Sequence, residues 1–123
     1  MRNFKLINLV IGLLLLQFVL GILATLYSTI PSQNPGEVFH HFNIIVLHGI
    51  TGTLLIILGI VYLIKVKGKA EFKYALSGLI NMLLAYGFGE LFVFKQNNVF
   101  SFLMALAFIG SLMSYTKISN SLL

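Results

Sequence analysis

Four long apolar runs divide this chain, and they constrain its fold more than any other feature. The runs cover approximately residues 6–27, 42–64, 74–94 and 99–115. A helix needs about 20 apolar residues to cross the hydrocarbon core of a bilayer. Backbone polar groups cannot stay unpaired in hydrocarbon, so each run is expected to be a helix. A strand of a β-barrel would show alternating polarity, and none of these runs alternates.

The composition requires lipid around most of the surface. Of the 123 residues, 59% are hydrophobic and only 9% are charged, whereas soluble domains carry about 25% charged residues. A chain this short has a large surface for its volume, and so few charges would not cover that surface in water. The lipid bilayer is therefore the expected partner. The absence of cysteine excludes disulfides and thiolate metal sites.

Basic residues outnumber acidic residues by eight to three, but their placement argues against a nucleic-acid partner. They flank the apolar runs and do not line one face of a folded domain. Seven of the eight belong to the N-terminus, the second connection or the C-terminus, namely Arg2, Lys5, Lys65, Lys67, Lys69, Lys73 and Lys117. In a chain of four spanning helices these three places lie on one side of the membrane. The positive-inside rule makes that side cytoplasmic.

The connections between the runs contain turn-forming or charged residues at 31–36, 65–69 and 95–98. Short connections make consecutive helices antiparallel neighbours. The sequence therefore predicts one all-α domain over residues 1–123, a four-transmembrane-helix up-down bundle in the cell membrane with both termini cytoplasmic. The first run is too long for the apolar part of a signal peptide, and no A-x-A site follows it, so we expect a retained helix.

Small and polar residues recur at helical spacing and predict which faces of the helices pack together. Lipid does not drive helix association, so such residues mark the contacts between helices. On the first helix they are Gln17, Gly21, Ala24 and Ser28, and on the second they are His41, His48, Gly52 and Gly59, with Leu55 on the same stripe. On the third they are Gly78, Asn81, Ala85 and Gly89, and on the fourth Ser101, Ala105, Gly110 and Ser111.

All three histidines of the chain lie in the segment HHFNIIVLH, where the second run begins. His40 and His41 are expected at the level of the lipid headgroups. His48 lies about two turns deeper, roughly 10 Å along the axis at 1.5 Å per residue. An ionisable side chain at that depth is a candidate for a functional site. Counted inward from the same side of the membrane, Glu90 and Met104 belong to the same layer as His48.

One interpretation makes His48 an axial ligand of haem b. Haem iron accepts histidine together with a second histidine or a methionine, and Met104 lies at a suitable depth. Gly52 and Gly59 follow His48 on one face and would leave a flat strip for the macrocycle. His41 shares that face and is a further candidate for contact with the cofactor.

Three other interpretations of His48 stay open. The imidazole can donate to a backbone carbonyl or pair with Glu90 only to hold the helices in register. It can join His41 and Glu90 around a metal ion such as zinc or copper, since imidazole and carboxylate suit both metals. It can also form a proton-handling pair with Glu90, because histidine titrates near neutral pH.

The segment LHGITGTLLIILG, at residues 47–59, resembles the histidine-bearing helices of the haem A synthase family, which follow the pattern L-H-x-x-x-G and an aliphatic run. In that family each half is a four-helix bundle, and histidines on its second and fourth helices bind haem. The resemblance would cover one such half, and it implies that His48 is a haem ligand. The fourth run here contains no histidine. Met104, or the His48 of a second copy, would have to supply the second ligand.

The function predicted from the sequence is a small haem-binding or redox-associated membrane subunit. The alternative is a structural accessory subunit of a larger membrane complex without a cofactor of its own. Either role implies other membrane subunits, or further copies of the chain, as partners. No P-loop, nucleophile elbow or HExxH motif occurs, and no catalytic residue is predicted.

Overall fold

The computed structural model describes residues 2–27, 30, 33–40 and 42–123, with only the backbone of residue 2. The four long helices are α1 Arg2–Tyr27, α2 Ile44–Lys65, α3 Phe72–Lys95 and α4 Asn98–Ser121, and a short 3-10 helix, η1 Pro35–Phe39, precedes α2. The described residues include no strand. Each of the four long helices is long and apolar enough to cross a membrane. The predicted all-α fold of four spanning helices is confirmed.

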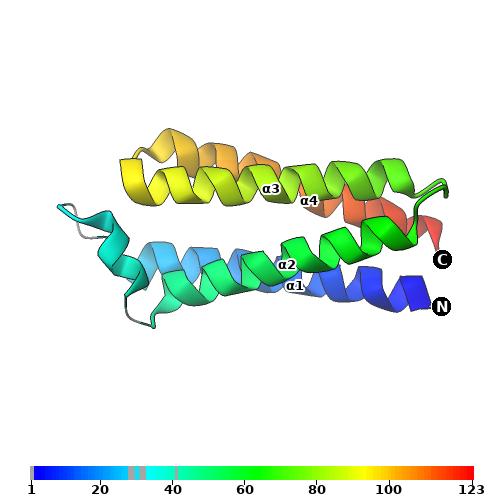
Figure 1. Ribbon diagram of the computed structural model, residues 1–123, viewed down its shortest axis with the longest axis horizontal. Coiled ribbons are helices and arrows are strands. Elements are labelled where there is room, and N and C mark those ends of the chain that lie inside the picture. Colours follow the sequence, from blue (N-terminus) through cyan, green and yellow to red (C-terminus); the bar gives the residue numbers. More distant parts are fainter. Residues whose placement is uncertain (1, 28–29, 31–32, 41) are drawn as a thin grey trace.

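The helices lie side by side, and each runs antiparallel to the one before it (Figure 1). Both termini and the α2–α3 connection lie together at one end, which we call the basic end. The other end, which we call the histidine end, holds η1 and the α3–α4 connection. The up-down arrangement follows from connections too short to carry the chain back along the bundle.

Asparagine side chains define two helix starts at the histidine end. Asn43 precedes α2, and its side-chain oxygen accepts hydrogen bonds from the backbone amides of Ile45 and Val46 at 2.8 and 3.1 Å. Asn97 precedes α4 and accepts from the amide of Val99 at 2.9 Å. Such caps satisfy amides that the first turn of a helix leaves without a partner. They place the start of α2 just past the predicted start at residue 42.

The fourth helix is longer than its apolar run. It continues to Ser121, past the predicted end at Tyr115. The prediction counted apolar residues, and the last turns of α4 carry polar residues such as Lys117. The helix persists because these turns still bury a face, with Ile118 fully enclosed.

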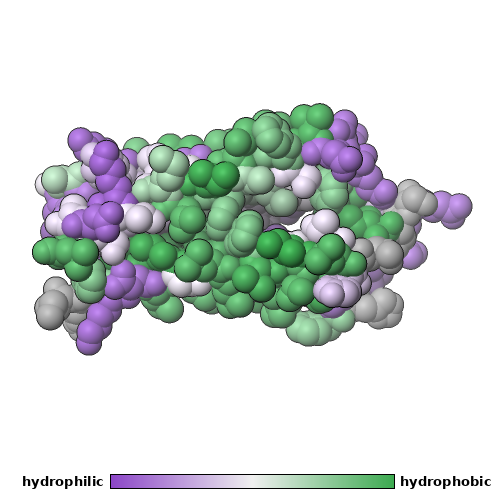
Figure 2. Space-filling view, turned by 180° about the vertical axis from the view of Figure 1, so that it is seen from behind, coloured by the Kyte–Doolittle hydropathy of each residue, from purple (hydrophilic) through white to green (hydrophobic). Residues whose placement is uncertain are grey.

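Most of the apolar surface faces outward. Only 17–22% of the most apolar window of each helix is buried inside the protein. Figure 2 shows the result as a hydrophobic belt between two more polar ends. Large side chains such as Phe18, Ile57 and Leu83 are about half exposed. A surface this apolar over the whole length of a bundle matches a hydrocarbon surrounding.

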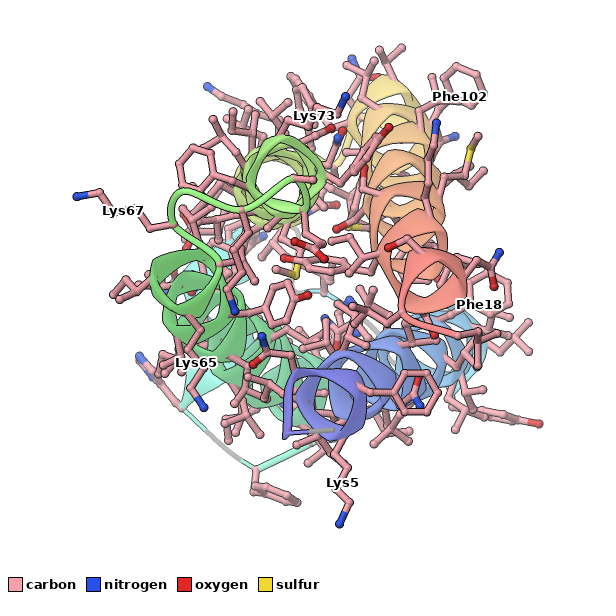
Figure 3. All side chains as sticks on the ribbon, turned by 90° about the vertical axis from the view of Figure 1, so that its right-hand side faces the viewer. Lys5, Phe18, Lys65, Lys67, Lys73 and Phe102 are labelled. Atoms are coloured by element: carbon pink, nitrogen blue, oxygen red, sulfur yellow. The ribbon has the colours of Figure 1, made fainter. Side chains whose placement is uncertain are left out.

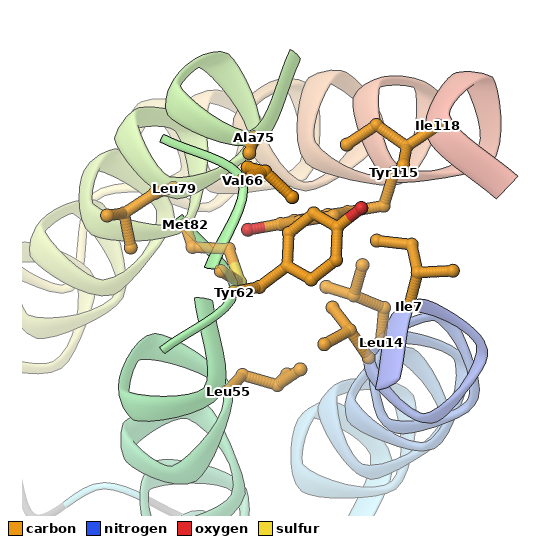
Figure 4. Close-up of a cluster of buried hydrophobic side chains, with 11 residues drawn as sticks. Ile7, Leu14, Leu55, Tyr62, Val66, Ala75, Leu79, Met82, Tyr115 and Ile118 are labelled. Atoms are coloured by element: carbon orange, nitrogen blue, oxygen red, sulfur yellow. The ribbon is translucent and has the colours of Figure 1, made fainter. Parts of the chain in front are cut away.

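The tightly packed core lies toward the basic end. It consists of Ile7, Val10, Leu14, Leu55, Tyr62, Val66, Ala75, Leu79, Met82, Tyr115 and Ile118 (Figure 4). Two tyrosine rings, Tyr62 and Tyr115, occupy its centre and are fully buried. Glycine makes room for one of them, since a Cβ on Gly78 would lie 2.7 Å from the ring of Tyr115.

Side-chain hydrogen bonds join α3 to α4. The Ser111 hydroxyl donates to the Gly78 carbonyl at 2.8 Å, and the Ser114 hydroxyl lies 3.2 Å from that of Ser77. Asn81 packs on Gly110, since a Cβ on Gly110 would lie 2.8 Å from the Oδ1 atom of Asn81. Of the residues predicted for the interior of these two helices, Gly78, Asn81, Gly110 and Ser111 therefore do form a helix contact, whereas Ala105 is exposed.

Candidate functional site

His48 lies near the start of α2 and turns its imidazole toward α1. A Cβ on Gly21 would lie 3.2 Å from the Cε1 atom of the ring, so the ring rests directly on this glycine. Helical spacing puts His48 on the same face as Gly52 and the buried Leu55. The side chain is thus directed into the protein and is partly buried.

Gln17 of α1 makes the reciprocal contact with α2. Its Nε2 atom would lie 2.9 Å from a Cβ on Gly52. Gln17 and Gly21 are one turn apart on α1, as His48 and Gly52 are on α2. Because α1 and α2 are antiparallel, each polar side chain packs on the glycine of the other helix. The faces predicted from the small and polar residues do meet here.

Two polar atoms in this contact have no hydrogen-bond partner. They are the Oε1 atom of Gln17 and the Nδ1 atom of His48, and both are buried. The backbone of Gln17 is a polar neighbour of the imidazole ring. A buried polar atom without a partner costs about 1–3 kcal/mol. Two such atoms in one helix contact indicate a place where a further polar group would be stabilised. We call Gln17, Gly21, His48 and Gly52 the polar layer.

The third helix also reaches the polar layer. The Cδ2 atom of Tyr86 would lie 3.8 Å from a Cβ on Gly52. Thr51 is buried beside the layer, but its hydroxyl donates to the Leu47 carbonyl at 2.9 Å and is satisfied. Within this neighbourhood the unpaired atoms are therefore those of the amide and the imidazole.

The structure brings together only some of the predicted haem-site residues. His48 and Gly52 share the polar layer, whereas Met104 packs against α3, with its sulfur 3.1 Å from a Cβ position on Gly89. Gly59 lies in the packed core, where a Cβ would collide with Met82 and would lie 3.0 Å from the Tyr115 hydroxyl. Side chains therefore cover both glycines of the predicted strip. Gln17 covers Gly52, and the core residues Met82 and Tyr115 cover Gly59.

The predicted metal ligands are placed as follows. Glu90 is exposed on α3, and His41 lies outside the described residues. His40 is exposed at the end of η1. In the part of the chain that the structure describes, no group of three His, Cys, Asp or Glu side chains is arranged to hold a metal ion.

Sequence reasoning assigned Gln17 to an interior face but not to the site. The repeated spacing of a polar residue and a glycine, four positions apart on both helices, is the signal that could have paired it with His48. The buried pair Tyr62 and Tyr115 was missed altogether. A sequence pattern does not distinguish a tyrosine at the membrane interface from one inside the bundle.

The segment before α2 covers the histidine end of the bundle. Val38 of η1 is buried, and the rings of Phe39 and Phe94 lie 6.2 Å apart. The Asn43 side chain donates to the Val38 carbonyl at 2.7 Å and ties η1 to the start of α2. These contacts hold η1 over the ends of α2 and α3, above the polar layer.

Comparisons of the chain with protein-family models, with curated proteins and with solved structures find no match. The resemblance to the haem A synthase family therefore stays a prediction from residues 47–59.

Proposed function

We propose that this protein is a small multi-pass subunit of the cell membrane that binds haem b through His48 and takes part in membrane redox chemistry. The seven basic residues at one end support an orientation with that end, and both termini, in the cytoplasm. In this orientation the polar layer belongs to the outer half of the membrane. The haem assignment rests on one observation, the buried Nδ1 atom of His48 that no protein group satisfies.

The surroundings of His48 suit a ligand to a metal centre. A histidine ligand usually binds with one ring nitrogen and donates a hydrogen bond from the other to a backbone carbonyl or carboxylate. Here Nδ1 is unpaired and the Gln17 backbone lies beside the ring. Haem supplies one-electron chemistry when bound. The protein contributes the imidazole, an apolar surrounding and the cover of η1.

Space for the macrocycle has to come from movable side chains. Gln17 covers Gly52 with the far end of a flexible side chain, which can turn away without a shift of the backbone. The core around Gly59 is fully packed, so the proposal places no part of the haem there. Met104, or His48 from a second copy, would supply a second ligand to the haem iron.

The absorption spectrum of the detergent-extracted protein tests this proposal. We expect a Soret band that shifts on reduction and that His48→Ala abolishes. His40→Ala is the matched control, since it removes an exposed histidine from the same end of the bundle. Helical content by circular dichroism verifies that both variants are folded. A wild-type protein that stays colourless after incubation with hemin, or a folded His48→Ala variant with full haem content, would contradict the proposal.

A structural role as an accessory subunit is the second candidate, and a different observation favours it. Gln17 and His48 each pack on a glycine of the other helix, which is how side chains lock two helices together. In this role the layer has no ligand, and His48→Leu should lower the stability of the bundle, because it alters the packing on Gly21, without changing any absorption band. If that variant loses the Soret band but keeps its stability, the result supports the cofactor role and contradicts the structural role.

A further inference from the structure

The basic end carries cationic side chains that have no acidic partners. Lys5 and Lys67 point away from the bundle in the view along its axis (Figure 3). Glu71, which precedes α3, is the one acidic side chain of the sequence in this region. Among the described residues, no lysine forms a salt bridge. The positive charge of this end is therefore available to an anion from outside the chain.

Two other lysines of this end, Lys73 and Lys117, lie over the same tyrosine ring. The Nζ atom of Lys73 lies 5.0 Å from the centre of the Tyr74 ring, and that of Lys117 lies 4.9 Å from the same point. Lys73 comes from α3 and Lys117 from α4, and both side chains are exposed. The ring attracts both ammonium groups, although the two positive charges repel each other. An anion near both would attract each of them and offset that repulsion.

An exposed apolar row continues from each lysine into the membrane-spanning part of its helix. Leu76 follows Lys73 at i+3 and is 38% exposed, and Met113 precedes Lys117 at i−4 and is 68% exposed. Residues at these spacings share a helix face. The two positive charges thus lie at the basic end of two apolar rows, one on α3 and one on α4. A molecule with an anionic head and long acyl chains complements both parts, whereas free phosphate complements only the head.

We propose that Lys73, Tyr74 and Lys117 bind the phosphate group of an anionic phospholipid whose acyl chains lie along Leu76 and Met113. The lipid joins α3 to α4 at the basic end. The proposal is independent of the haem site, which lies toward the other end of the bundle. Basic pockets between spanning helices are suited to such headgroups.

The test uses the full chain in phosphatidylcholine bilayers that contain a minor fraction of phosphatidylglycerol. Spin-labelled lipids report the association constant of phosphatidylglycerol relative to phosphatidylcholine. We expect the wild type to prefer phosphatidylglycerol, and Lys73→Gln with Lys117→Gln to lower the preference about tenfold. The matched control, Lys65→Gln with Lys67→Gln, removes the same charge from the same end and should lower the preference less than about threefold.

Three results would overturn the proposal. An equal loss in both double variants would assign the preference to the diffuse field of the basic end. No preference for phosphatidylglycerol in the wild type would exclude the site. Displacement of the labelled lipid by millimolar inorganic phosphate would make free phosphate the ligand. If the double variant does not fold, Lys117→Gln replaces it as the test. A loss of preference of about threefold supports the site, and an unchanged preference would overturn it.

Discussion

The two halves of this bundle use the same packing device with different side chains. Toward the basic end a tyrosine ring lies on Gly78, and toward the histidine end an amide and an imidazole lie on Gly52 and Gly21. Both halves contain buried polar atoms without a partner, since the hydroxyls of Tyr62 and Tyr115 also have none.

The difference between the halves is access. Tyr62 and Tyr115 are fully enclosed, whereas Gln17 and His48 are only partly buried. Their unpaired Oε1 and Nδ1 atoms are nevertheless buried, so an outside molecule reaches these atoms only after neighbouring side chains such as Gln17 turn away. The comparison teaches that an unpaired polar atom indicates a binding site only where something can approach it. Of the two halves, the one toward the histidine end comes closer to that condition, because its polar side chains are partly exposed.

The largest expected effect comes from removing a buried ring from the core toward the basic end. Tyr115→Ala should lower the free energy of unfolding by about 2–4 kcal/mol, because it removes a fully buried ring from the centre of the core. Tyr115→Phe removes only the unpaired hydroxyl and should change stability by less than about 1 kcal/mol. Unfolding in mixed micelles, followed by circular dichroism, measures both. Equal losses in the two variants would mean that the hydroxyl, not the ring, supports the core.

A smaller effect should follow from overfilling the same half. Gly78→Ala brings a Cβ to 2.7 Å from the buried Tyr115 ring and should cost about 1–3 kcal/mol. Gly12→Ala is the matched control, because nothing lies within 4 Å of a Cβ at that position. The same unfolding assay compares the two variants. If both changes are neutral, the packing at Gly78 is looser than the structure describes.

The smallest effect should come from the histidine end. Gln17→Leu removes a buried, unpaired oxygen and should leave stability unchanged or raise it by up to about 1 kcal/mol. Asn81→Leu is the contrasting control, since the Asn81 amide donates to the Ser77 carbonyl at 2.9 Å and that bond would be lost. A clear loss of stability for Gln17→Leu would show that the amide has a stabilising partner, and the contrast between the halves would fail.

Much of the fold could be predicted from local pattern. The number of helices, their approximate limits and the gathering of seven basic residues at one end all follow from the spacing of apolar runs and charges. The end of α4 could not be predicted in this way. Its last turns are polar in sequence, and they are held by the burial of Ile118 against other helices.

The candidate site was predictable only in part. His48 was identifiable because an ionisable side chain stands out in an apolar run. The layer assigned to Met104 and Glu90 came from counting residues inward from the helix ends. Such counting gives depth but not direction around the helix axis. The structure directs Met104 toward Gly89 and leaves Glu90 exposed.

The sequence by itself determined that this protein has four helices suited to a membrane, because chain length and apolar composition decide that for each segment separately. Only the tertiary structure decided which side chains meet. Rotation and depth of each helix depend on contacts with its neighbours, and those contacts put His48 on Gly21, Gln17 on Gly52 and two lysines beside one tyrosine. Residues far apart in the chain become neighbours only through that packing.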